Sequence, residues 1–376
     1  MEQTYVPPDS PVGPALDALE ADPDVSGLLV LATDAAGPHA TDLADRLAGS
    51  SLTAFGGAFP QVIADGTARE TGTLLLGLRE APAVTPVEGL SDPDADFDAQ
   101  LPDLLVEGYR TAFVLADAFA TRTEALVGAL FDAYGVEVTV LGGGAGSLSM
   151  EQAPCLLTED GWVEDAAVVA ATRAAGSVGV SHGWREFAGP FRVTDADGPV
   201  VRLLGDKPAF EVYRDLIEPD IGRELTADNF FEVAKSYPLG LSRFEAEKIV
   251  RDPFEPTADG GIRCFGEVPA GSFVHVLKGE PDSLVAAARE AAAAAREAAA
   301  AARESASTAG GETLFFDCIS RVLYLGDEFD RELAAVGEGD AGPLVGALTV
   351  GEIANSGREF LELYNKTAVV GVVEGL

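Results

Sequence analysis

The sequence contains few residues that build disulfides or metal sites. Cysteine and histidine occur three times each in 376 residues, always far apart, at Cys155, Cys264, Cys318, His39, His182 and His275. This spacing excludes a disulfide framework and a CxxC metal motif. A zinc site would have to combine ligands from distant segments. We therefore expect no structural metal.

Long apolar runs and clusters of basic residues are also missing. No apolar run reaches the roughly 20 residues of a membrane span. Residues 1–10 lack the basic and apolar regions of a signal peptide. Lysine and arginine number 25 against 62 acidic residues, and they form no patch that could neutralise phosphates. We expect a cytoplasmic protein that binds neither nucleic acid nor a membrane.

What the sequence has in excess is negative charge over an apolar interior. The formal net charge is −37, and 47% of the residues are hydrophobic, so the composition is that of a globular chain and not of a disordered acidic one. Only five lysines occur: Lys207, Lys235, Lys248, Lys278 and Lys366. This balance predicts a halophilic, acidic protein from a high-salt cytoplasm. An ordinary acidic protein from a low-salt cell is the alternative.

The charge leads to a prediction about salt. At molar salt the Debye length falls to about 3 Å, which screens the mutual repulsion of surface carboxylates. The melting temperature is therefore expected to rise markedly between low salt and molar KCl, as measured by calorimetry or circular dichroism. A melting temperature that stays flat over this range would show that the structure itself compensates the charge.

Three segments of the chain repeat one order of predicted elements: a strand, a helix, a glycine-rich turn, a hairpin and a closing strand. The opening strand, helix and closing strand are predicted at 27–34, 40–48 and 73–78; at 112–117, 122–134 and 166–171; and at 313–318, 328–336 and 367–373. The glycines are Gly56, Gly57, Gly142, Gly143, Gly144, Gly346 and Gly351. Duplication of one unit explains this order, and chance similarity is the alternative.

The repeats predict a mixed α/β (α+β) fold, with sheets built from the repeated units and helices packed outside. The strands look hydrophobic on both faces, so each sheet should be covered on both sides. Between the second and third copies, short strands and a helix at 208–217 interrupt the pattern. Residues 283–307 are predicted to form an alanine-rich helix. This helix is expected to lie closely on a sheet, and the alternative is a coiled-coil contact.

Seven residues are candidates for one ligand pocket. The glycines follow strands without a Walker motif or GxGxxG, so they serve either close backbone packing or a ligand-facing amide. The Arg321 guanidinium could bind a ligand carboxylate, or it could form an ion pair with Glu352. The Glu352 carboxylate could in turn bind a ligand ammonium. Because related turns gather at one end of a sheet, we expect one pocket there. Its residues would be Gly56, Gly57, Gly142, Gly143, Arg321, Glu352 and Asn365.

The sequence offers no catalytic constellation. Cys318 has no histidine nearby in the sequence to act as its base, so it is expected to be a buried thiol. No serine–histidine–aspartate order or paired-carboxylate signature is present. We therefore do not expect an enzyme.

Several short motifs, in their order from residue 27 to 373, resemble the FIST domain family (F-box and intracellular signal transduction). They are Phe55-Gly56-Gly57, Leu141 to Gly144, His182-Gly183-Trp184, Tyr237 to Gly240, Val250-Arg251-Asp252, Val268 to Ser272, Phe316 to Arg321, Gly351-Glu352-Ile353 and Tyr364 to Thr367. The resemblance implies an extension at 1–24, a FIST N-terminal domain at 25–225 and a FIST C-terminal domain at 226–376. It also implies a sensory role with a small-molecule ligand, amino acids being the usual proposal.

The family resemblance leaves two alternatives open. One is a haem-based nitric oxide sensor, for which His182 is conceivable as a ligand, although a hydrogen-bonded core histidine is the plainer interpretation and no other cofactor is expected. The second is a protein-interaction adaptor. We expect no output domain in this chain, and therefore a separate signalling partner.

Overall fold

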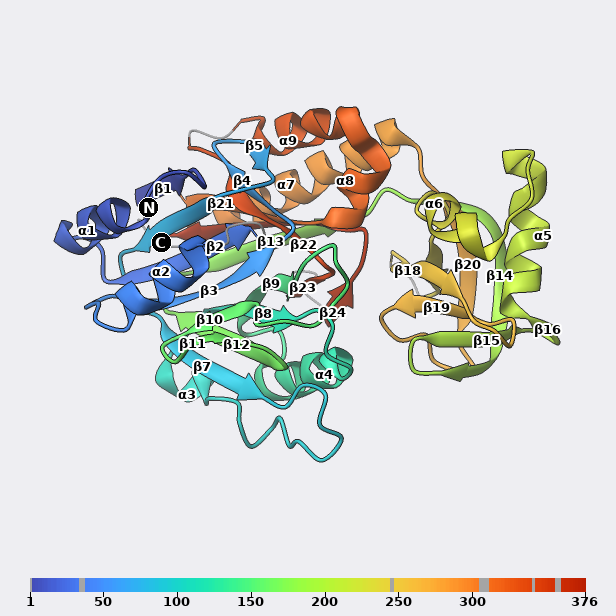
Figure 1. Ribbon diagram of the computed structural model, residues 1–376, viewed down its shortest axis with the longest axis horizontal. Coiled ribbons are helices and arrows are strands. Elements are labelled where there is room, and N and C mark those ends of the chain that lie inside the picture. Colours follow the sequence, from blue (N-terminus) through green and yellow to red (C-terminus); the bar gives the residue numbers. More distant parts are fainter. Residues whose placement is uncertain (1, 34–37, 244–246, 304–310, 340–341, 356–359) are drawn as a thin grey trace.

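The structure is a computed structural model that describes residues 2–33, 38–243, 247–303, 311–339, 342–355 and 360–376. Three six-stranded sheets form one body, and a seven-stranded sheet closes into a barrel beside it (Figure 1). The chain contains many helices and many strands, which confirms the predicted mixed α/β class.

The three sheets of the body share one strand order. In that order, the first sheet has β1 (Glu2–Val6), β6 (Thr73–Leu78), β2 (Gly27–Thr33), β3 (Thr53–Phe59), β10 (Leu156–Thr158) and β11 (Gly161–Val163). The second has β7 (Ala83–Glu88), β12 (Ala166–Thr172), β8 (Thr111–Asp117), β9 (Thr139–Ala145), β23 (Glu352–Asn355) and β24 (Leu361–Tyr364). The third has β13 (Gly176–Ser181), β25 (Ala368–Glu374), β21 (Gly311–Cys318), β22 (Val345–Thr349), β4 (Gln61–Ala64) and β5 (Thr67–Arg69).

The predicted repeat is confirmed in these pairings. The opening strand of each unit pairs in parallel with the strand after the helix: β2 with β3, β8 with β9, and β21 with β22. On its other side it pairs antiparallel with the closing strand β6, β12 or β25. The helices between the two parallel strands are α2 (Pro38–Leu47), α4 (Thr123–Tyr134), and α8 (Ile319–Leu325) with α9 (Phe329–Gly337).

The hairpin of each unit pairs outside its own unit, which the sequence did not predict. Hairpin β4–β5 of the first unit extends the third sheet through β22. Hairpin β10–β11 of the second unit extends the first sheet through β3, and β23–β24 of the third extends the second sheet through β9. Each sheet is therefore completed by another unit, which ties the three units into one body.

Alternate residues of the central strands face two different cores. Leu29, Phe113 and Leu314 belong to an inner core that all three sheets share. Their neighbours Leu28 and Val114 face outer cores that helices cover. The covering helices are α1 (Gly13–Ala21) and α2 on the first sheet, α3 (Leu104–Glu107) and α4 on the second, and α7 (Pro281–Arg303) and α9 on the third. The strands are thus buried on both faces, as predicted.

The alanine-rich segment forms α7, and residues 304–307 of the predicted helix lie outside the described residues. Its buried alanines pack against β13 and β25. At Gly179 of β13 a Cβ atom would come within 1.9 Å of the Ala291 carbonyl oxygen, so only glycine allows this approach. This confirms a helix laid closely on a sheet. In the described part of the chain, no helix is both long and apolar enough to cross a membrane.

The barrel precedes the third unit in the chain and lies between β13 and α7, which belong to the third sheet and to the helices that cover it. Its strands are β14 (Arg185–Asp197), β15 (Val200–Leu204), β16 (Lys207–Pro208), β17 (Leu239–Leu241), β18 (Ile249–Pro256), β19 (Ile262–Phe265) and β20 (Phe273–Lys278). Strand β14 pairs with both β20 and β15, which closes the ring. Helices α5 (Ala209–Ile221) and α6 (Phe230–Ala234) pack on its core. The domain boundary predicted near residue 225 falls between these two helices.

Six of the seven glycines predicted to form turns lie within strands, which corrects that expectation, whereas Gly351 does lie in the turn between β22 and β23. Gly56, Gly142 and Gly346 occupy equivalent places in β3, β9 and β22, opposite Val30, Val114 and Phe315 of the parallel neighbour. A Cβ at these glycines would stand 2.1, 2.1 and 1.8 Å from the carbonyl oxygen of that opposite residue. Close backbone approach explains the glycines.

Candidate functional site

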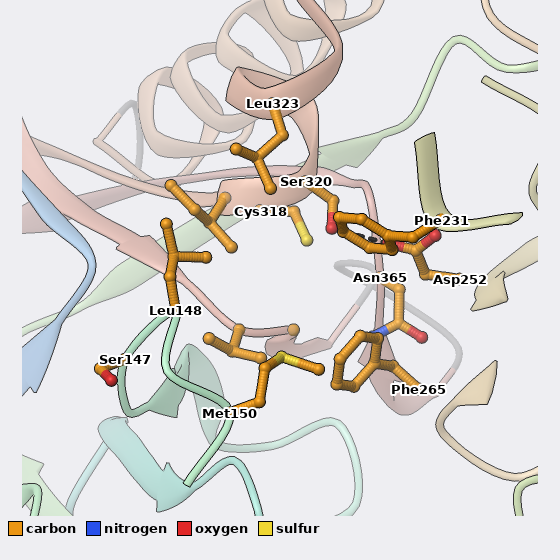
Figure 2. Close-up of a pocket in the computed structure, with 13 residues that line it drawn as sticks. Ser147, Leu148, Met150, Phe231, Asp252, Phe265, Cys318, Ser320, Leu323 and Asn365 are labelled. Atoms are coloured by element: carbon orange, nitrogen blue, oxygen red, sulfur yellow. Dashed lines mark hydrogen bonds between the residues drawn. The ribbon is translucent and has the colours of Figure 1, made fainter. Parts of the chain in front are cut away.

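A small cavity lies where the body meets the barrel (Figure 2). The body contributes Cys318 at the end of β21, Ser320 in the first turn of α8, and Leu148 and Met150 after β9. The barrel contributes Asp252 of β18. The cavity encloses about 30 Å³. A water molecule needs roughly 10–15 Å³ by this measure, so there is room for about two.

The mouth of the cavity is apolar. Leu148, Met150 and Phe231 of α6 are 49, 43 and 42% exposed, although their side chains are large and hydrophobic. Phe265 of β19 and Leu323 of α8 also line the space. Exposed apolar groups that surround a small cavity are typical of a binding site and uncommon elsewhere on a highly charged surface.

Two buried oxygens in the wall lack hydrogen bonds. Asp252 is 2% and Asn365 is 4% exposed. Among the residues that the structure describes, neither the Asp252 Oδ1 nor the Asn365 Oδ1 has a hydrogen-bond partner. The other Asp252 oxygen accepts from the Ser320 Oγ at 2.6 Å and lies 3.2 Å from the Lys366 Nζ. Buried acceptors without partners are costly, so this wall favours a donor from a bound molecule or from water.

Lys366 connects the body to the barrel at the same point. Its ammonium is buried, donates to the Lys235 carbonyl at 3.2 Å and lies 5.2 Å from the centre of the Trp184 ring. Its main-chain carbonyl accepts from the Trp184 Nε1 at 2.9 Å and from the Arg321 Nη1 at 3.2 Å. Because Asp252 and Lys235 belong to the barrel side, the turn at Lys366 fixes the barrel against the sheets.

Arg321 is fully buried, and its guanidinium faces the protein interior. Its Nε lies 2.9 Å from the Glu332 Oε1 and 3.1 Å from the Asp317 Oδ1, and its Nη1 donates to the His182 carbonyl at 2.7 Å. The Nη2 donates to the Leu284 carbonyl at 3.1 Å. Its acidic partners are therefore Glu332 and Asp317, and not the Glu352 that one sequence-based interpretation gave it.

Asp317 and Glu332 are both within ion-pair distance of the one Arg321 guanidinium. Burial, and secondly the neighbouring Glu332, raise the pKa of Asp317 well above its usual range. Burial and the second carboxyl therefore favour the protonated form of Asp317, and Arg321 favours the charged form of its acidic neighbours.

Of the seven residues predicted to gather around one pocket, the structure places only Asn365 in this cavity wall. The four glycines do not line it, but β9 places Gly143 directly opposite Glu352 of β23, so these two predicted residues are neighbours. Glu352 follows Gly351, which lines the cavity, but its carboxyl is buried in the body. It accepts from the Thr349 Oγ1 at 2.9 Å and the Thr367 main-chain N–H at 3.3 Å.

Burial raises the pKa of Glu352 to about 8. A carboxyl whose pKa is raised by folding stabilises the fold below its unfolded pKa of about 4.3, and this contribution is lost as pH rises through about 8. The free energy of unfolding should therefore fall between pH 5 and 9, and Glu352→Gln should make this fall smaller. Urea titrations across this range measure it. The exposed Glu137→Gln is the matched control, and an equal slope in all three proteins would contradict the assignment.

The histidines and thiols near the junction give no support to catalysis or to haem. Burial and the Arg321 charge lower the pKa of His182 to about 3, and its Nδ1 accepts from the Trp184 main-chain N–H at 2.8 Å. Neither His182 nor His275 lines the cavity. Burial also raises the pKa of the Cys318 thiol, which disfavours the nucleophilic thiolate. Among the described residues, no group of three His, Cys, Asp or Glu side chains could hold a metal ion.

Sequence reasoning missed Asp252, Met150 and Phe231. Asp252 lay inside the Val250-Arg251-Asp252 motif, and its acidic side chain among apolar strand residues was a usable signal. The contact between this strand and the third unit could not be foreseen, because 68 positions separate Asp252 from Ser320.

Comparison with known proteins gives two matches. A family model described as the FIST N domain matches residues 15–207, and one described as the FIST C domain matches residues 209–355. No curated protein matches the chain.

Proposed function

Because the chain belongs to the FIST family, which is associated with sensing in signal transduction, we propose that it is a sensor that binds a small molecule between the three-sheet body and the barrel. The observation that carries this proposal is that Asp252 and Asn365 both line one cavity, while the Oδ1 atom of each is buried and lacks a partner among the described residues.

The position of the cavity supports a ligand site. Cys318 ends β21, Val350 follows β22 and Ser147 follows β9, so the cavity lies beyond the carboxyl ends of three strands. Ligands of α/β sheets are commonly bound at that edge. The junction of two compact parts of a chain is a second frequent location.

The small volume implies that the junction opens to admit a ligand. About 30 Å³ is far less than the space an amino acid occupies. The chain joins the barrel to the body at two short segments, 182–184 and 279–280. Asp252 both faces the cavity and bonds Ser320 and Lys366 of the body. A ligand at Asp252 would therefore change how the barrel is held, and this change is the signal that we propose a separate partner protein reads.

The predicted amino acid or similar metabolite stays a prediction, as does the cytoplasmic location. An adaptor that works without a ligand is the second prediction from the sequence, but no feature of the cavity favours it. The haem alternative gains nothing from the cavity wall, which contains no described histidine.

A metabolite screen on a cavity-filling variant tests the proposal. Leu323 projects from α8 into the cavity, so Leu323→Trp should fill it. A ligand present at 100 times its Kd stabilises the fold by about 2.7 kcal/mol, which appears as a rise in melting temperature. We expect this rise with at least one compound in molar KCl, and we expect Leu323→Trp to abolish it.

The control is Leu105→Trp, an exposed position on α3 at the opposite side of the body from the barrel (Figure 1). It should keep the full rise in melting temperature. A ligand whose effect survives in Leu323→Trp would place binding elsewhere, and a screen without any stabilising compound would count against a sensor.

A further inference from the structure

The polar groups of the cavity indicate which end of a ligand they bind. The free Asp252 Oδ1 and Asn365 Oδ1 are both acceptors, and both side chains are at least nine-tenths buried. Figure 2 shows Asp252 and Asn365 on one side of the cavity, together with the rings of Phe231 and Phe265. A carboxylate oxygen bonds most strongly to a charged donor. Aromatic faces and a polarisable methionine also suit a cation.

The same wall is unsuited to an anion. Among the described residues that line the cavity there is no lysine, arginine or histidine. The nearest buried ammonium, that of Lys366, lies 3.2 Å from the Asp252 Oδ2 and donates to the Lys235 carbonyl. Arg321 bonds Glu332 and faces away. A ligand carboxylate would therefore enter an enclosed space beside Asp252 without a charged partner, which is costly.

We propose that the cavity binds an organic amine in its ammonium form, without an adjacent carboxylate. The ammonium donates to the Asp252 Oδ1 and, after the Asn365 amide turns so that its oxygen replaces the nitrogen that faces the cavity in Figure 2, to the Asn365 Oδ1. The apolar body lies against Leu148, Met150 and Phe231. This inference rests on the proposed function and narrows it, since an α-amino acid carries its carboxylate next to the ammonium. The incoming ammonium shares Asp252 with Lys366, so binding weakens the ion pair that fixes the barrel.

The experiment compares ligands that share one apolar body. Calorimetry on the full chain in molar KCl uses 3-methylbutylamine, leucine and 3-methylbutanol, and then 2-phenylethylamine, phenylalanine and 2-phenylethanol. Each amine is expected to bind at least tenfold more tightly than its amino acid and its alcohol. Asn365→Ala should weaken amine binding at least tenfold. Asp252→Asn should weaken it further, and Asp220→Asn, which removes a barrel carboxylate outside the cavity, should leave it unchanged.

The other outcomes separate this inference from the proposed function. Amino acids or alcohols that bind as tightly as the amines would overturn the inference and leave a small-molecule sensor standing. The inference also fails if none of the six compounds binds while the metabolite screen finds a ligand that Leu323→Trp blocks. If Asp252→Asn does not fold, the test rests on Asn365→Ala alone. Unchanged amine binding in Asn365→Ala would then contradict the proposed site. Absence of any ligand in both experiments would overturn both proposals.

Discussion

Replacing Arg321 by methionine is expected to lower the free energy of unfolding by about 3–5 kcal/mol, as is typical when one partner of a buried ion pair is removed. The guanidinium is fully buried and bonds Glu332 and the carbonyl groups of His182, Leu284 and Lys366. Its loss leaves a buried carboxylate without its charged partner and removes one donor from each of the three carbonyls. Urea unfolding in molar KCl measures the change.

A second substitution and a surface control make this result specific. Adding Glu332→Gln to Arg321→Met removes the orphaned charge and should recover part of the loss. Arg289→Met is the matched control, because Arg289 bonds Glu338 at 3.2 Å with both side chains more than half exposed, a contact worth about 0–1 kcal/mol. Equal small losses in both single variants would contradict a structural role. Loss of ligand binding without loss of stability would restore the role in carboxylate binding predicted from the sequence.

The second large effect is expected at the equivalent glycines of the parallel strands. Gly346→Ala places a Cβ 1.8 Å from the Phe315 carbonyl oxygen, at a φ of +157° that side chains rarely adopt. The backbone cannot move aside there as a flexible side chain can. The free energy of unfolding should therefore fall by more than about 3 kcal/mol. Gly142→Ala, with a contact of 2.1 Å to the Val114 carbonyl oxygen, should cost a similar amount.

The control for the glycines is Gly128→Ala in α4, where a Cβ meets no atom within 4 Å. Alanine is favoured over glycine in a helix by about 1 kcal/mol, so this variant should be as stable as the native protein or slightly more stable. Thermal unfolding of the three proteins gives the comparison. Tolerance of alanine at both strand positions would show that these strands do not approach as closely as described.

The local elements of the fold could be predicted, because they depend on nearby residues. The closing strand 73–78 has the predicted bounds, and α4 differs from its predicted range by one residue. The exchange of hairpins could not be predicted. The strand that contains Val62 pairs with Ala347 of another unit, and an apolar strand shows only that it is buried, not which neighbour it joins.

The candidate site was predicted less well for the same reason. The sequence indicated polar groups at the ends of related strands, and Asn365 does line the cavity. It could not show that Arg321 finds Glu332, 11 residues away on the next helix, or that the inserted barrel brings Asp252 to Ser320. Partner choice among charged residues depends on packing between distant elements, which no local pattern contains.

The most direct test of the central claim is a crystal structure of the protein grown with the most stabilising compound of the metabolite screen. The account predicts electron density for that compound between the body and the barrel, with a donor within hydrogen-bond distance of the Asp252 Oδ1 and the Asn365 Oδ1. Density for the compound at another place, with only ordered water beside Asp252 and Asn365, would contradict it.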